Sequence, residues 1–203
     1  MRQAEAFLFG EGDNWYERNK RAELNYNVVN AILELDIQPD RILEVGCGNG
    51  RYLAEYQRYF AGRGCTYHGI DPSQKAIADG RANYQGIKFW VNTALKGLQQ
   101  LHEYRLKYDL IIFGFCLYVV DREDLFDIVA MADRLLADGG HIAIHDFAPS
   151  VVYKVPYHHK QGLFTYKMDY ARLWLGNPGY KEIARQTPAP AESMVIIKKV
   201  GWE

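Results

Sequence analysis

The sequence contains little of what marks several specialised classes of protein. It has only three cysteines, Cys47, Cys65 and Cys116, and their odd number and wide spacing favour buried, reduced thiols over a disulfide framework or a zinc site. It shows no secretory signal, no evident repeat and no apolar run long enough to span a bilayer. A net charge of −1 offers no electrostatic footprint for nucleic acid. We therefore expect a cytoplasmic protein that binds neither membranes nor nucleic acid.

Helical patterns alternate with short apolar runs along most of the chain, and this order is typical of a parallel sheet with helices on both faces. A helix is expected at residues 22–35, and another at 121–136, which Asp121 would cap and Asp138-Gly139-Gly140 would end. The 203 residues suffice for one domain with its own core. Seven strands are expected, at residues 41–45, 66–70, 88–91, 109–113, 141–145, 181–186 and 194–200.

The segment 41–50, RILEVGCGNG, is an apolar strand that runs directly into a glycine-rich turn and then into a helix. Gly46, Gly48 and Gly50 let the backbone turn tightly and approach a ligand closely. The carboxyl end of a parallel strand is where open α/β sheets bind nucleotide-like ligands. Dinucleotide-binding oxidoreductases and tight structural turns also contain such glycines, so the turn alone does not name a ligand.

Two acidic residues narrow the choice of ligand. Glu44 lies in the first strand, and Asp71 ends the second, where a carboxylate can accept hydrogen bonds from both hydroxyls of a ribose. With LEVGCGNG and GIDPS, the chain resembles the class I S-adenosylmethionine-dependent methyltransferases. An NAD-binding enzyme would be expected to have GxGxxG, and Arg51 stands where its last glycine would be.

The resemblance implies that S-adenosylmethionine is the cofactor, with its methionine part over Gly46 and Gly48 and its ribose on Asp71. Further cofactor-binding candidates from the same two motifs are Glu44, Cys47 and Pro72. The implied fold is a doubly wound, Rossmann-like α/β sheet of seven mostly parallel strands with an antiparallel last strand. We expect one domain over residues 1–203, divided into an N-terminal lid and helix (1–36), a cofactor-binding core (40–146), an aromatic lid (147–180) and a terminal hairpin (181–203).

Two later motifs match the family less closely. Where many members have Gly-Asp-Ala after the third strand, this chain has Asn92, Thr93 and Ala94, which could still bond adenine. After the fourth strand, residues 114–119 resemble the family's cofactor loop, which makes Phe115 and Leu117 candidates. The Asp/Asn-Pro-Pro-Tyr/Phe sequence of methylases that act on bases is missing there, which argues against a nucleic-acid substrate.

Residues 11–19 precede the first strand and mix two large aromatics with charged side chains. In the family such segments commonly fold over the cofactor, so Tyr16 and Arg18 are candidates for cofactor binding. The stretch also resembles the opening of small bacterial methylases that belong to surface-sugar pathways. The alternative is an ordinary amphipathic helix start with Asp13 as its cap.

The segment 147–180 is too long for an ordinary connection and is rich in aromatic residues, so we interpret it as a substrate lid. Its rings have polar tips suited to sugars or aromatic metabolites, although such rings also pack loops onto sheets. The candidates for substrate binding are Tyr153, Tyr157, Tyr166 and Tyr170.

His145 and Asp146, at the carboxyl end of the fifth strand, are the first candidates for acid–base catalysis, followed by His158 and His159. A metal-dependent O-methyltransferase would need a cluster of oxygen ligands, which the His pair alone does not indicate, so no metal is expected. The expected reaction is methyl transfer to a small, hydroxylated metabolite such as a sugar or secondary metabolite, by a monomer or homodimer. The alternatives are a non-catalytic binding module of the same fold, a nucleic-acid methyltransferase and an NAD-dependent oxidoreductase.

Overall fold

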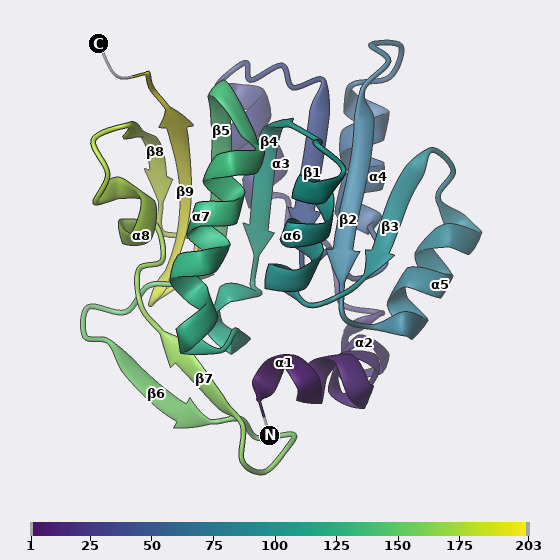
Figure 1. The fold of residues 1–203 in the computed structure, drawn as a ribbon, viewed down its shortest axis with the longest axis vertical. Coiled ribbons are helices and arrows are strands. Elements are labelled where there is room, and N and C mark those ends of the chain that lie inside the picture. Colours follow the sequence, from purple (N-terminus) through teal and green to yellow (C-terminus); the bar gives the residue numbers. More distant parts are fainter. Residues whose placement is uncertain (1, 202–203) are drawn as a thin grey trace.

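The computed structural model describes residues 2–201, which form a seven-stranded sheet between two layers of helices (Figure 1). The strand order is β3-β2-β1-β4-β5-β9-β8. All neighbours pair in parallel except β9, which is antiparallel to both β5 and β8. The strands are β1 Arg41–Val45, β2 Thr66–Asp71, β3 Ile87–Val91, β4 Tyr108–Gly114, β5 Leu136–Phe147, β8 Tyr180–Gln186 and β9 Glu192–Lys199. The expected fold class and all seven predicted strands are confirmed.

Both faces of the sheet are buried, so its central strands are almost wholly apolar. On β4, Leu110 and Ile112 pack with α3, α4 and α5, whereas Ile111 and Phe113 face the layer of α6, α7 and α8. Successive side chains of a strand point to opposite faces, so one strand contributes side chains to two separate hydrophobic cores. The helices are α3 Asn27–Glu34, α4 Arg51–Tyr59, α5 Gln74–Asn83, α6 Ala94–Glu103, α7 Leu125–Leu135 and α8 Arg172–Leu175.

The strand order changes direction between β1 and β4: β2 and β3 follow β1 on one side of the sheet, and β5 follows β4 on the other. Ligands of open α/β sheets bind at such a switch point, beyond the carboxyl ends of the strands. In Figure 1 the parallel strands all point toward α1 (Gln3–Ala6) and α2 (Gly12–Asn19), which cross this edge of the sheet. A kinked π-helical turn, Phe7–Glu11, joins the two helices. The N-terminal segment therefore covers the place where a ligand is expected.

Two predicted helix boundaries were wrong. Residues 20–26 are not helical, so the helix expected at 22–35 begins at Asn27. Asp121 does not cap the following helix, because its carboxylate accepts hydrogen bonds from the backbone of Gln3 and Ala4 at the start of α1, at 2.9 and 2.8 Å. Helix α7 starts only at Leu125, after a 3-10 turn over Arg122–Asp124. A tertiary contact thus replaces the predicted local cap.

The segment between β5 and β8 is only partly a lid. It contains a two-stranded hairpin, β6 (Tyr153–Pro156) with β7 (Phe164–Lys167), and then helix α8. Trp174 of α8 is 1% exposed and packs against Phe113 in the core. Within residues 2–201 no helix is both long and apolar enough to cross a membrane.

Candidate active site

The glycine turn after β1 is a surface against which a ligand can lie closely. Gly46 and Gly48 have φ values of 77° and 56°, which few residues with a Cβ adopt. A Cβ on Gly46 would lie 2.6 Å from the Cβ of Cys116, whereas the space beside Gly48 is open. Gly46 is therefore fixed by packing, and Gly48 presents bare backbone to the cavity.

Asp71 ties this turn to the end of β2. Its Oδ2 accepts a hydrogen bond from the Gly48 amide at 2.8 Å, and its Oδ1 accepts one from the Ser73 amide at 2.8 Å. Burial raises the pKa of Asp71 to about 6, against the lowering effect of these two amides. Each carboxylate oxygen has a further lone pair, so the group can still accept hydrogen bonds from a ligand diol.

Two cavities meet at Gly46, which lines both. The smaller one has a volume of about 80 Å³ and includes Pro72, Asn92, Thr93 and Ala94 in its walls. The larger one, of about 340 Å³, extends from Cys47 and Gly48 to the end of β5. Both cavities are thus lined by residues from the carboxyl ends of the strands and the loops that follow them.

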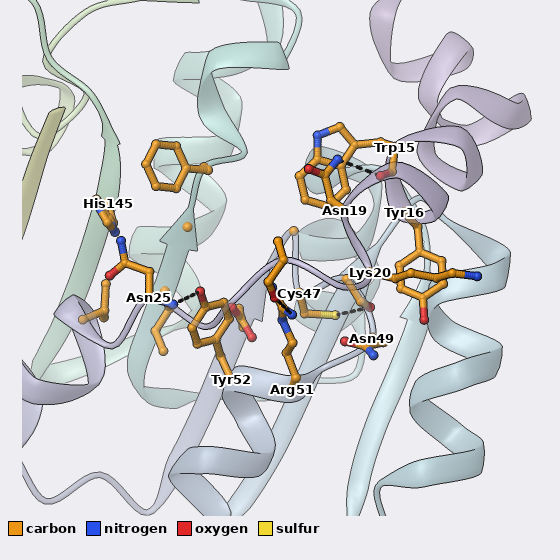
Figure 2. A pocket seen from close by; sticks show the side chains of 18 of the residues that line it. Trp15, Tyr16, Asn19, Lys20, Asn25, Cys47, Asn49, Arg51, Tyr52 and His145 are labelled. Atoms are coloured by element: carbon orange, nitrogen blue, oxygen red, sulfur yellow. Dashed lines mark hydrogen bonds between the residues drawn. The ribbon is translucent and has the colours of Figure 1, made fainter. Parts of the chain in front are cut away.

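The larger cavity is roofed by the N-terminal segment and closed by aromatic rings. Figure 2 shows Trp15, Tyr16 and Asn19 on α2 above the glycine turn, and His145 at the far side on β5. The rings of Phe115, Tyr118 and Phe147 also line it. Phe115 and Phe147 lie 5.6 Å apart in an edge-to-face arrangement, as do Tyr118 and Phe147 at 5.1 Å. This end of the cavity is apolar and suited to exclude water.

Glu44 is a buried acid without a hydrogen-bonding partner for its Oε2. It is 4% exposed and lines the larger cavity. Burial, followed by the negative charge of Asp71, raises its pKa to about 8. An unsatisfied buried carboxyl is costly unless a ligand completes it. A donor group of positive charge, such as an ammonium, fits this position.

His145 is 3% exposed, lines the same cavity and packs against Phe115 with 4.5 Å between ring centroids. Its Nε2 is buried without a hydrogen bond and lies 3.7 Å from the nearer carboxylate oxygen of Glu192. Burial lowers the pKa of His145 below its usual value, although Glu192 raises it in part. The imidazole is therefore neutral near pH 7 and able to accept a proton.

Sequence comparison identifies the family at this point. Residues 43–142, which contain the glycine turn, Asp71 and the strands up to β5, match a family model described as a methyltransferase domain. This part of the chain is therefore a methyltransferase domain. The open backbone at Gly48 and the unsatisfied carboxyl of Glu44 fit S-adenosylmethionine, the cofactor that the sequence motifs imply.

The methyltransferase also resembles many solved structures, at low sequence identity. The DhpI–S-adenosylhomocysteine complex has a TM-score of 0.68 and 14% identity, over 98% of this chain and 97% of that one. A 1,6-didemethyltoxoflavin-N1-methyltransferase from Burkholderia thailandensis has a TM-score of 0.68 and 15% identity, over 97% and 85%. The plantazolicin methyltransferase BpumL has a TM-score of 0.64 and 14% identity, over 98% of this chain and 96% of that one. These likenesses establish a shared fold, and no curated protein sequence matches the chain.

Asp146 of the methyltransferase is not placed for acid–base catalysis. It is 1% exposed, and its carboxylate accepts hydrogen bonds from the backbone amides of Leu117, Tyr118 and Phe147 at 3.0, 3.4 and 2.8 Å. Burial raises its pKa to about 7. Asp146 lies on the face of β5 opposite to His145, so the two side chains do not form a dyad. Asp146 holds the loop after β4, and with it Leu117, which is buried at 1% and lines neither cavity.

The four tyrosines predicted to bind substrate line neither cavity. Tyr170 is buried in the core at 1% exposure, where its hydroxyl donates to the carbonyl of Tyr166 at 2.6 Å. Tyr166 itself packs beneath the guanidinium of Arg122, and Tyr153 is 45% exposed. His158 and His159 are exposed and also lie outside the cavities. The structure does not bring these six residues into the walls of the cavities, because their segment packs onto the sheet and the N-terminal helices.

Tyr157 and Arg18 belong to a buried cluster that holds the N-terminal segment in place. The Tyr157 hydroxyl donates to Oε1 of Glu11 at 2.9 Å, and Arg18 contacts both the same oxygen at 2.6 Å and the Tyr157 hydroxyl at 3.0 Å. Glu11 is 1% exposed. Arg18 lines neither cavity, whereas Tyr16 of the same helix lines the larger one.

Several residues of the cavity were not predicted. Arg51 and Tyr52 follow the glycine turn on α4, and Asn25 donates its backbone amide to the Tyr52 hydroxyl at 2.9 Å (Figure 2). Trp15 and Asn19 were within the segment expected to form a lid, and their helical spacing with Tyr16 was the available signal. Within residues 2–201 no three His, Cys, Asp or Glu side chains are grouped so that they could hold a metal ion.

Proposed function

We propose that this methyltransferase methylates a small, hydroxylated metabolite that binds in the larger cavity. The observation that carries the proposal is that one cavity extends from the glycine turn to an end lined by aromatic rings and by His145. A cofactor across Gly46 and Gly48 and an acceptor beside His145 would therefore share one enclosed space.

We assign the parts of the cofactor to the two cavities by their chemistry. The smaller cavity offers the amide of Asn92 and the hydroxyl of Thr93 to an adenine ring, with Ala94 and Pro72 as apolar walls. Asp71, which is bonded to the amide of Gly48 beside the larger cavity, is suited to the ribose hydroxyls. Cys47 and Gly48 would contact the methionine part, and Glu44 its ammonium group. Tyr16 and Phe115 would cover it from two sides.

When bound, S-adenosylmethionine supplies a methyl group on a positively charged sulfur that leaves as a neutral sulfide. The protein's main task is then to hold the acceptor in line with the methyl group at near-contact distance. The rings of Phe115, Tyr118 and Phe147 pack edge to face and would form a rigid wall against the acceptor. For a hydroxyl acceptor, His145 would take the proton, a contribution of about 10²- to 10⁴-fold. The buried ring is neutral and so in the required state.

Three features support a small molecule over a macromolecule as acceptor. The net charge of −1 provides no attraction for a polyanion. Helix α2 roofs the cavity, so a base or side chain attached to a polymer would have to enter past Trp15 and Asn19. Structures of the same fold include enzymes named for 1,6-didemethyltoxoflavin and plantazolicin and for no nucleic acid or protein.

The proposal is tested by incubating the protein with isotopically labelled S-adenosylmethionine and a fractionated metabolite extract. Label should appear in a low-molecular-mass product that is heavier by one methyl group in place of one hydrogen. The Asp71→Ala variant, which should bind the cofactor poorly, is the control for contaminating activity. Label found only in nucleic acid or protein would contradict the small-molecule acceptor. Binding of S-adenosylhomocysteine without turnover on any fraction would favour the non-catalytic alternative.

A further inference from the structure

Glu192, the first residue of β9, is a charged side chain at the site that the proposed reaction does not yet use. In the antiparallel pairing of β5 with β9, His145 lies opposite Met194 and Phe147 lies opposite Glu192. Glu192 and His145 are therefore diagonal neighbours on one face of the sheet, a separation that long side chains bridge. The sheet register brings the two groups together although they are far apart in sequence.

The contact is specific to one nitrogen of the ring. Nε2 of His145 lies 3.7 Å from Oε2 of Glu192 and has no hydrogen-bonding partner, although it is fully buried. An imidazole nitrogen without a partner in such a place is costly, and a small rotation of either side chain would make the bond. Hydrogen bonds of catalytic groups are often long in ligand-free enzymes and tighten in the complex.

Glu192 has no competing charged partner in the part of the chain that the structure describes. Its carboxylate takes part in no other ion pair or side-chain hydrogen bond there, and its side chain is 23% exposed. Asp146, next to His145 on β5, points to the other face and is bonded to backbone amides. The β4 side contributes Phe115, which is uncharged. Glu192 is thus the charged group that acts on His145.

We propose that Glu192 is a positioning residue for His145, accepting Nε2–H so that the lone pair of Nδ1 faces the acceptor. This rests on the proposed function. In the transfer, the acceptor's proton moves to Nδ1, the acceptor oxygen uses the freed electron pair for its bond to the methyl carbon, and the carbon–sulfur electron pair stays on sulfur. The carboxylate stabilises the imidazolium until its proton passes to water.

The pairing can be tested without turnover, by NMR titration of His145 in the complete protein with and without S-adenosylhomocysteine. The chain has six histidines, and His145→Gln identifies the relevant signal by its loss. Removing a neighbouring negative charge with Glu192→Gln should lower the pKa of His145 by about one pH unit or more. Glu182→Gln on β8, whose carboxylate pairs with Arg185 instead, is the matched control and should cause no shift.

Turnover adds a second readout once an acceptor is known. In Glu192→Gln, kcat should fall by about tenfold or more, and the acidic limb of its pH profile should move to lower pH, with the KM for S-adenosylmethionine unchanged. Glu192→Asp should restore part of the shift. An unchanged pKa of His145 in Glu192→Gln would overturn the pairing. If the pKa shifts but His145→Gln retains full activity, the pair exists and the proposed base is wrong, so the two failures are distinguishable.

Discussion

The buried carboxyl of Glu44 should make cofactor binding depend on pH. Its pKa of about 8 means that the protonated form predominates at neutral pH in the ligand-free protein. Because the pKa of Glu44 is higher in the folded than in the unfolded protein, its contribution to stability is fully present below the pKa of the unfolded state. That contribution is lost as the pH rises through about 8. An ammonium group of a bound ligand would stabilise the carboxylate form of Glu44 and so lower its pKa. Binding should therefore release a proton from Glu44.

The size of the effect follows from the fraction of carboxylate that is ready to bind. A group with a pKa of about 8 is roughly 1% ionised at pH 6 and about half ionised at pH 8. If only the carboxylate binds well, the affinity for S-adenosylhomocysteine should increase by about 50-fold over this range, or about 2.3 kcal/mol. Asp71, with a pKa of about 6, should add about twofold over the same range.

Titration calorimetry at pH 6, 7 and 8, in buffers with different ionisation enthalpies, measures both the affinity and the protons released. The wild-type protein should release nearly one proton at pH 7. In Glu44→Gln the affinity should vary only about twofold between pH 6 and 8, the contribution left to Asp71. An affinity of the wild-type protein that is flat from pH 6 to 8 would refute the assignment of Glu44 to the ammonium group.

Three further predictions concern the turn, the ribose contact and the N-terminal cluster. Gly46→Ala should lower the free energy of unfolding, measured by urea denaturation, by about 1 to 3 kcal/mol more than Gly62→Ala, because both glycines have positive φ but only a Cβ at Gly46 would also clash. Asp71→Ala should weaken S-adenosylhomocysteine binding by about 1.5 to 3 kcal/mol in calorimetry, and unchanged affinity would place the ribose elsewhere. Tyr157→Phe should cost about 1 to 3 kcal/mol of unfolding free energy, whereas Tyr153→Phe, at an exposed position, should change it by less than about 0.5.

The sheet could be predicted from sequence because most of its strands carry their own local signal. Residues 109–113 are almost all apolar, as a strand buried on both faces requires. The glycine turn and Asp71 could be placed together because the carboxyl ends of neighbouring parallel strands meet at one edge. These features depend on short segments and on general rules of connection, so no knowledge of distant contacts was needed.

The residues around the acceptor could not be predicted in the same way. The abundance of rings in residues 147–180 indicated burial, but not which surface each ring would meet. Tyr170 enters the core and Tyr157 the cluster with Glu11, whereas Phe147 alone of that stretch lines the larger cavity. Glu192 reaches His145 only through the antiparallel register of β9, which no local pattern specifies.

A crystal structure of the complex with S-adenosylhomocysteine tests the central claim most directly. We expect the adenine in the smaller cavity beside Asn92 and Thr93, the ribose hydroxyls on Asp71, and the sulfur directed into the larger cavity toward His145. A complex with the adenine beneath α2 and the amino-acid part in the smaller cavity would contradict it. So would a sulfur that faces away from the space in front of His145, because no acceptor in the larger cavity could then be reached.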